Sequence, residues 1–156
     1  MPRQQRGKTF EDDFRESFNA LPAVLCERLN DQEGRRRGVS APCDFYVYSY
    51  PTLFFVELKS TRARRLEFGR ISPNQWKGLA ERSKIPGVIA GVLIEYQNMS
   101  EPRVKFYRIE QLVAMREAGK RSVSVLEGAC ILNGVRRRTR YRYDVEPWLM
   151  TVSGGG

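Results

Sequence analysis

The chain has 156 residues, a hydrophobic content of 41%, a formal net charge of +9 and no histidine. That length suits one domain, which we expect to span residues 1–153, followed by a disordered glycine tail at 154–156. The lack of histidine excludes histidine bases, histidine nucleophiles and His-ligated zinc, so any chemistry must use carboxylates, Lys, Tyr, Ser or Cys. The large positive charge predicts a polyanionic partner.

The first helix is predicted from three phenylalanines that recur at every fourth position. Phe10, Phe14 and Phe18 would form the apolar face of an amphipathic helix that ends near Pro22. A short strand is expected over residues 24–29, because that segment is mostly apolar.

Two further strands are expected between Asp44 and Lys59, joined by a two-residue connection at Tyr50-Pro51. Such a connection pairs residues whose numbers sum to 101, which places Asp44 opposite Glu57. Because side chains alternate along a strand, Lys59 shares the face of Glu57. The opposite face would pack against a core through three apolar residues: Phe54, Val56 and Leu58.

The rest of the chain predicts an α/β sandwich, a mixed sheet flanked by helices. We expect a helix over 74–83, a central buried strand over 88–96, a strand over 103–107, a helix over 110–118 and a late strand over 135–145. Residues 119–134 carry no readable pattern.

No apolar run is long enough to span a membrane, and the N-terminus has no signal-peptide core. The cysteines, odd in number and widely spaced, predict reduced thiols. We therefore expect a cytoplasmic protein with no membrane association.

Two carboxylates and one ammonium on one patch suit phosphodiester cleavage. Carboxylate oxygens hold Mg²⁺ or Mn²⁺, and such an ion polarises a phosphate and activates a water. A lysine can stabilise negative charge in the transition state. The competing interpretation is a solvated cross-strand ion pair, which is what most charged runs are.

Three segments together resemble the PD-(D/E)xK nuclease superfamily over roughly residues 7–95. Asp44, Glu57 and Lys59 match its signature, although Pro42-Cys43-Asp44 has one residue inserted into the usual Pro-Asp. The segment Gly7-Lys8-Thr9-Phe10-Glu11 is similar to the glutamate-bearing start of the first helix in Holliday-junction resolvases of the RecU and archaeal Hjc type. The segment 72–76, Ser-Pro-Asn-Gln-Trp, resembles the element that opens their next helix.

The resemblance implies a restriction-endonuclease-like core and a divalent-metal-dependent DNA endonuclease, most similar to a Holliday-junction resolvase acting in recombination and repair. In that family pattern Asp44, Glu57 and the carbonyl of Leu58 ligate Mg²⁺, with Mn²⁺ able to substitute. Glu11 assists as a ligand, and Lys59 stabilises the transition state or activates water. Gln75 lies near the phosphate. The resemblance also implies a homodimer on four-way DNA junctions, with no nucleotide cofactor.

Several alternatives stay open. Thr9-x-x-Asp12 and Ser72-x-x-Gln75 both have the form of a helix capping box, and Glu11 could simply favour a helix N-terminus. RecU-type enzymes carry a stalk before the catalytic Asp, whereas only residues 30–43 are available here, an economy that suits a phage or mobile-element enzyme. The alternative functions are a restriction or repair endonuclease of the same superfamily and a noncatalytic nucleic-acid-binding module.

Arginine clusters form the expected DNA-binding surface, since Arg makes bidentate contacts to phosphate. A single strand over 135–145 would place Arg136, Arg138, Arg140 and Arg142 on one face. The alternative is an edge strand that its charges protect from aggregation. The remaining predicted phosphate contacts are Arg35, Arg36, Arg37, Arg62, Arg64 and Arg65.

Overall fold

The protein is described by a computed structural model that covers residues 3–29, 41–97, 103–127, 130–132, 134–137 and 140–153. Within these ranges, side chains are described for 9–29, 41–97, 104–127 and 143–150. No helix in the described ranges is long and apolar enough to cross a membrane.

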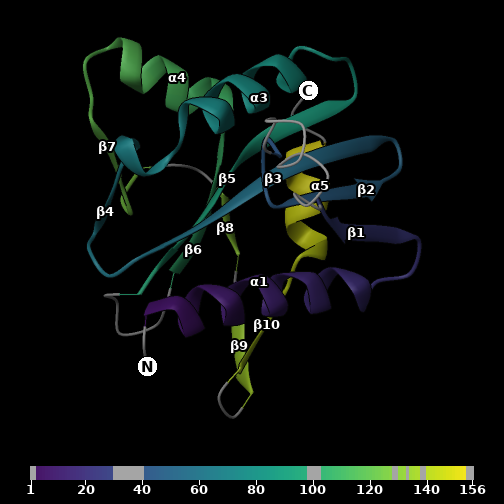
Figure 1. The fold of residues 1–156 in the computed structure, drawn as a ribbon. Coiled ribbons are helices and arrows are strands. Elements are labelled where there is room, and N and C mark those ends of the chain that lie inside the picture. Colours follow the sequence, from purple (N-terminus) through teal and green to yellow (C-terminus); the bar gives the residue numbers. More distant parts are fainter. Residues whose placement is uncertain are drawn as a thin grey trace.

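A six-stranded sheet in the order β1-β2-β3-β5-β6-β8 forms the middle of the fold (Figure 1). Its strands are β1 (Val24–Arg28), β2 (Phe45–Ser49), β3 (Thr52–Thr61), β5 (Val88–Tyr96), β6 (Arg103–Arg108) and β8 (Cys130–Leu132). Only β3 and β5 run parallel, and the other neighbours are antiparallel. The predicted mixed sheet is confirmed, and 88–96 is a strand with the predicted bounds next to its centre.

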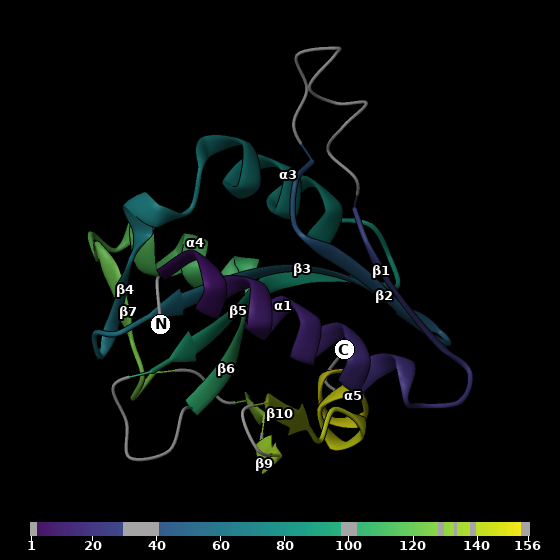
Figure 2. The ribbon, with the colours of Figure 1, turned by 60° about the horizontal axis from the view of Figure 1, so that its bottom comes forward.

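Helices cover both faces of this sheet (Figures 1 and 2). One face packs against α1 (Arg3–Asn19) and α5 (Glu146–Ser153), and the other against α3 (Pro73–Ser83) and α4 (Ile109–Glu117). The three helix phenylalanines are buried as predicted, and Phe14 packs on Phe45 while Phe18 packs on Trp148. The chain therefore forms a three-layer α/β/α structure.

The register of the β2–β3 hairpin is the one that the two-residue connection predicts. Phe45 pairs with Val56 and Ser49 with Thr52, around a cis Tyr50-Pro51 bond. The apolar residues Phe54, Val56 and Leu58 are buried against α1 and α5, as expected. Position 44 thus lies opposite position 57, just before β2 begins.

The predicted start of the first helix is wrong. Helix α1 begins at Arg3, so Thr9 and Glu11 lie within it rather than at its N-terminus. Thr9-x-x-Asp12 is therefore not a capping box, and Glu11 gains nothing from the positive end of the helix dipole, which acts only on the first turn. The helix also ends at Asn19, three residues before Pro22.

The predicted late strand over 135–145 is also wrong, because this segment is a hairpin. Strands β9 (Gly134–Arg137) and β10 (Arg140–Tyr143) pair antiparallel, with Arg136 opposite Tyr141 and Arg142 opposite Val135. Paired positions share a face of the ladder, so positions 136 and 142 fall on opposite faces. Arg138 lies outside the described residues.

Two short strands and a helical turn extend the fold beyond the central sheet. β4 (Arg65–Glu67) pairs with β7 (Ser122–Ser124), and a 3₁₀ turn η1 (Phe68–Arg70) leads from β4 toward α3. The sequence predicted neither β4 nor β7, and it predicted neither β8 nor α5. Three-residue strands carry too few side chains to reveal an alternating pattern.

Candidate active site

Asp44, Glu57 and Lys59 converge at the end of the β2–β3 hairpin. The Lys59 ammonium lies 3.1 Å from Glu57 Oε1, and Asp44 Oδ2 accepts a hydrogen bond of 2.9 Å from the Leu58 amide. Glu57 is 3% exposed, whereas Asp44 and Lys59 are half-buried. The predicted triplet is a contacting cluster with limited solvent access, which is not the geometry of a solvated surface ion pair.

The backbone around Asp44 is held from two sides. Its carbonyl accepts a hydrogen bond of 2.8 Å from the Leu29 amide, directly after β1, while its side chain holds the Leu58 amide of β3. The amide and carbonyl of one strand residue point toward the same edge. The Leu58 carbonyl therefore faces the edge that Asp44 occupies, where the resemblance expects a ligand.

Gln75 joins this cluster from the first turn of α3. Its Oε1 accepts from the Ser72 amide at 3.0 Å, and its Nε2 donates to Glu57 Oε1 at 2.8 Å. Ser72 Oγ in turn accepts from the Gln75 amide, which completes a capping box with Pro73 in the first turn. Gln75 is thus a helix cap that also contacts the Glu57 carboxylate, and its expected place near the phosphate stays a prediction. The cap also fixes which end of the amide faces Glu57.

Burial raises the pKa values of both carboxyl groups. Burial, followed by the charge of Asp44, raises the pKa of Glu57 to about 8, against the opposing effect of Lys59. Burial also raises the pKa of Asp44, opposed by the Leu58 amide and then by Lys59. Without a cation, the pair therefore holds a proton more tightly than isolated carboxylates would.

Glu57 Oε2 is buried and has no hydrogen-bond partner. An orphaned carboxylate oxygen beside a second carboxylate fits a site for a hard cation. Among the described residues, no three Asp, Glu, Cys or His side chains gather closely enough to hold a metal ion. That number is not required, because Mg²⁺ is commonly bound through one or two carboxylates while waters and substrate phosphate supply its other oxygens. Asp44 and Glu57 therefore fit the divalent cation that the fold implies.

Glu11 is linked to the cluster through a residue that the sequence did not reveal. Its Oε2 lies 2.9 Å from Nη2 of Arg28, the last residue of β1. The charge of Arg28 in turn lowers the pKa of Asp44. The structure thus places an arginine within electrostatic range of both acids. No local pattern marks Arg28, because the contact joins a helix to a strand across the fold.

Cys43, the residue inserted before Asp44, is buried, and its Sγ donates to the Phe45 carbonyl at 3.4 Å. Burial raises the pKa of this thiol to about 12, so it stays protonated and is a poor nucleophile. Cys26 is likewise buried and free. Both cysteines are therefore buried parts of the core.

The predicted arginine contacts are only partly described. Arg62 and Arg64 are exposed just after β3, and the Arg65 Nε donates to Ser122 Oγ at 2.7 Å. Arg35, Arg36 and Arg37 lie outside the described residues, and for Arg136, Arg140 and Arg142 only the backbone is described.

Comparison with known proteins finds likeness in structure and not in sequence. No family model matches the chain, and no curated protein matches it. A solved structure does: Hjc from Archaeoglobus fulgidus, described as a Holliday junction resolvase from an archaeal hyperthermophile. The match has a TM-score of 0.51 and 20% identity, and it covers 75% of this chain and 85% of that chain. At that identity the likeness establishes the architecture alone. The chain has an Hjc-like, restriction-endonuclease-like fold.

Proposed function

We propose that this protein is a divalent-metal-dependent DNA endonuclease that resolves four-way junctions. The observation that carries the proposal is the buried Glu57 carboxylate, which contacts Asp44, Lys59 and Gln75 yet leaves one oxygen without a partner. The likeness to Hjc supports a nuclease, because the same kind of sheet would present this cluster.

The residues divide the chemistry among them. Asp44, Glu57 and the Leu58 carbonyl would hold Mg²⁺, or Mn²⁺ in its place. When bound, the ion would polarise the scissile phosphate and lower the pKa of a water. Lys59, held by its ion pair with Glu57, places a positive charge where negative charge develops on the phosphate. Gln75 fixes the orientation of Glu57, so that the free oxygen stays directed into the site.

The substrate and the assembly follow from the likeness to Hjc and from symmetry. A four-way junction has two equivalent strands to cut, and a two-fold dimer presents one active site to each. The exposed Arg62 and Arg64 would contact DNA phosphates near the cut, since they follow the strand that carries Glu57 and Lys59. We place this activity in recombination and repair in the cytoplasm.

Cleavage of a labelled four-way junction tests the proposal directly. We expect paired nicks with Mg²⁺, no cutting with EDTA, and retained junction binding in both conditions. An excess of linear duplex of equal length should compete poorly with the junction. If duplex competes equally well, the protein is a general endonuclease of this fold. If DNA is bound but never cut across a titration of Mg²⁺ and Mn²⁺, it is a noncatalytic binding module and the proposal fails.

A further inference from the structure

A four-residue turn after β7, Ser124 to Glu127, is tied by its own side chains. The Glu127 amide donates to the Ser124 carbonyl at 3.0 Å, and the Ser124 amide donates to Glu127 Oε2 at 2.8 Å. Ser124 Oγ accepts from the Leu126 amide at 3.2 Å. Lys120 pairs with the other oxygen of Glu127, so this carboxylate is neutralised locally. Each of these contacts restricts the same turn.

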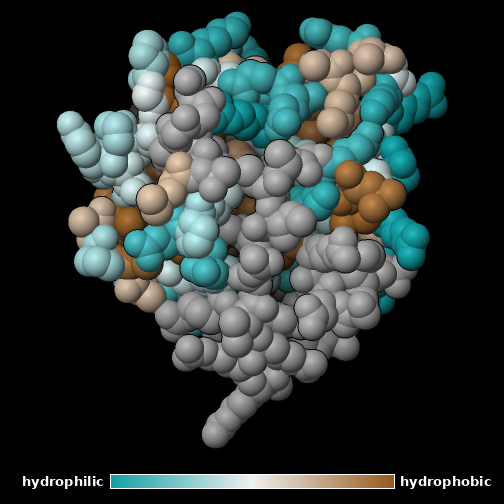
Figure 3. Space-filling model, turned by 180° about the vertical axis from the view of Figure 1, so that it is seen from behind, coloured by the Kyte–Doolittle hydropathy of each residue, from teal (hydrophilic) through white to brown (hydrophobic). Residues whose placement is uncertain are grey.

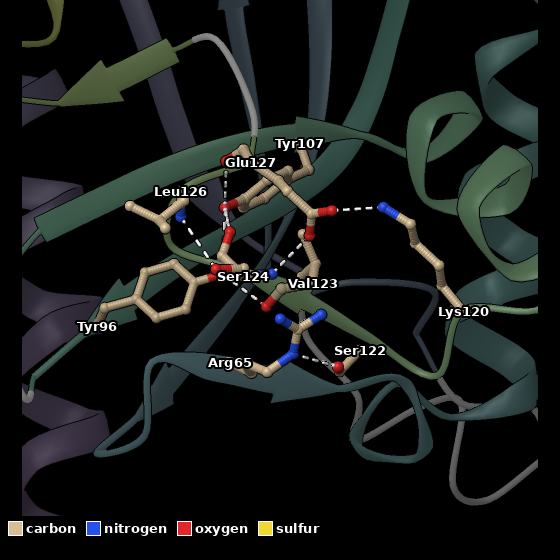
Figure 4. A network of polar contacts seen from close by, with 9 residues as sticks. All are labelled: Arg65, Tyr96, Tyr107, Lys120, Ser122, Val123, Ser124, Leu126 and Glu127. Atoms are coloured by element: carbon tan, nitrogen blue, oxygen red, sulfur yellow. Dashed lines mark hydrogen bonds and ion pairs between the residues drawn. The ribbon is translucent and has the colours of Figure 1, made fainter.

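Side chains of the central sheet also hold this turn (Figure 4). The Tyr107 hydroxyl lies within hydrogen-bond distance of the carbonyls of Ser124, at 3.0 Å, and Glu127, at 2.9 Å. The Tyr96 hydroxyl donates to the Val123 carbonyl at 3.2 Å, and the buried Lys105 ammonium donates to the Glu127 carbonyl at 3.2 Å. Burial raises the pKa of both tyrosines, so their hydroxyls remain donors. The backbone of the turn is thus held in place by hydrogen bonds from two neighbouring strands.

The Leu126 side chain points away from this turn and is 82% exposed (Figure 4). Single exposed apolar residues are normal, and Figure 3 shows only small apolar groups on the described surface of one side. Leu126 differs because so many buried polar contacts hold the turn that carries it. A rigid apolar projection can enter a partner without losing conformational entropy at the backbone.

The turn lies on the same sheet face as the candidate active site. Lys59, Ile94 and Lys105 are paired side by side across β3, β5 and β6. Neighbouring strands are separated by ~4.8 Å, so the backbones of Lys59 and Lys105 lie about 10 Å apart. Lys105 holds the turn at Glu127. Leu126 therefore projects from the face of the sheet that carries the catalytic cluster, from a turn held by a strand two positions away from β3.

Positive charge surrounds the projection. The Arg64 carbonyl accepts from the Val125 amide at 2.9 Å, which brings the exposed Arg62–Arg65 segment alongside the turn. Arg121 is exposed just before the same turn, whereas Lys120 is held by Glu127. Cations that bind a phosphate backbone and an apolar side chain that enters between bases are the pair of features by which proteins open a base step.

We propose that Leu126 is a wedge that contacts unstacked bases next to the cut, at the branch point of the DNA substrate. The inference rests on the proposed function and deepens it. At a branch point stacking is already interrupted, so the wedge meets bases that cost little to separate. On continuous duplex the same contact would require unstacking of a base step, which costs a few kcal/mol. The wedge thereby favours junction over duplex without reading base sequence.

A fluorescent base analogue at the branch point tests the wedge. The probe is a four-way junction with 2-aminopurine beside the crossover, bound in EDTA so that no strand is cut. Wild-type protein should raise the fluorescence, and Leu126→Met should do the same. Leu126→Ser should lose most of the rise and bind the junction about 10- to 100-fold more weakly, as expected when burial of one Leu is lost. Duplex binding and the salt dependence should be unchanged, because no charge is altered.

Ile85→Ser is the matched control, since Ile85 is also exposed, at 53%, but follows the far end of α3. It should leave both fluorescence and affinity as in wild type. The inference is overturned alone if wild type binds the junction with no fluorescence change, or if Leu126→Ser behaves as wild type. Loss of self-association in Leu126→Ser, measured by light scattering, would make the turn a protein interface instead. A wild type that binds no DNA overturns the proposed function as well.

Discussion

Two polar clusters, one around Glu57 and one around Tyr107, lie on the same face of the sheet and differ in how completely their polar groups are hydrogen-bonded. Around Glu57 the side chains are ionisable, burial raises the pKa values of Asp44 and Glu57, and one buried oxygen has no partner. Around Tyr107 the buried hydroxyls and the lysine ammonium meet backbone carbonyls at hydrogen-bond distance. A satisfied network stabilises one arrangement, whereas an unsatisfied buried carboxylate costs stability and persists where chemistry needs it. The first cluster is therefore the candidate for catalysis and the second for support.

Glu57→Gln should produce the largest effect and should separate catalysis from affinity. The amide preserves shape but removes a metal-binding charge, so junction cleavage should fall by ~100-fold or more, at or beyond the usual range for lost metal-site groups. Asp44→Asn should behave in the same way. Gel-based cleavage rates over a Mg²⁺ titration measure the loss, and gel shifts in EDTA should show unchanged binding. Cutting at the wild-type rate by either variant would remove the metal-site assignment.

The raised pKa of Glu57 predicts how stability depends on pH in EDTA. A carboxyl whose folded pKa is raised, from 4.5 to about 8, stabilises the fold most below pH 4.5 and loses that contribution as pH rises through 8. Wild type should therefore lose stability relative to Glu57→Gln between pH 4.5 and 8, by up to a few kcal/mol, since each pKa unit is worth about 1.4 kcal/mol. Urea unfolding of both proteins measures the gap. Parallel pH profiles would contradict the prediction.

Tyr107→Phe tests the supporting cluster. It leaves the carbonyls of Ser124 and Glu127 and the Tyr96 hydroxyl without this partner, so the free energy of unfolding should fall by ~1–3 kcal/mol. Binding of duplex, where Leu126 is not engaged, should change little at temperatures at which the variant is folded. Tyr50→Phe is the control, because Tyr50 is 83% exposed. Should Tyr107→Phe abolish cleavage while leaving stability intact, the division between the two clusters would be wrong.

Gln75→Ala and Ser72→Ala sharpen the comparison at the smallest scale. Both break the capping box of α3, and each should cost ~0.5–2 kcal/mol of stability. Only Gln75→Ala also removes the contact to Glu57, so only this variant should slow cleavage, by about 10-fold, as for a lost supporting contact at a metal site. Equal cleavage rates in the two variants would reduce Gln75 to a helix cap.

The parts of the fold that the sequence predicted are those with local rules. A two-residue connection determined the hairpin register, and with it the position of Asp44 opposite Glu57. The central strand was visible because it is apolar throughout. In contrast, Arg138-Thr139 carries none of the glycine or proline signals of a turn, so the hairpin was mistaken for one strand. Helix α5 had one unused signal, Pro147 in its first turn before a buried Trp148.

The part of the site that the sequence missed depends on long-range contacts. Arg28 meets Glu11 across the interface of a strand and a helix, and the turn at Leu126 depends on hydroxyls from two other strands. Neither contact has a spacing that could be read along the chain. For Gln75 the sequence left a helix cap and a role in the site as alternatives. A capping-box pattern accounts for the Oε1 atom of the amide, but it does not predict which group the Nε2 atom contacts.

The hydrogen bond between the Leu29 amide and the Asp44 carbonyl has an evolutionary consequence. This bond holds together the two ends of the segment that connects β1 to β2. The connection therefore begins and ends at a fixed position beside the active site. Doubling the length of such a connection costs only about 0.6 kcal/mol in closure entropy. The connection could therefore be lengthened or replaced during evolution without moving Asp44. A lineage could change its preferred DNA structure at this position while leaving the cleavage chemistry untouched.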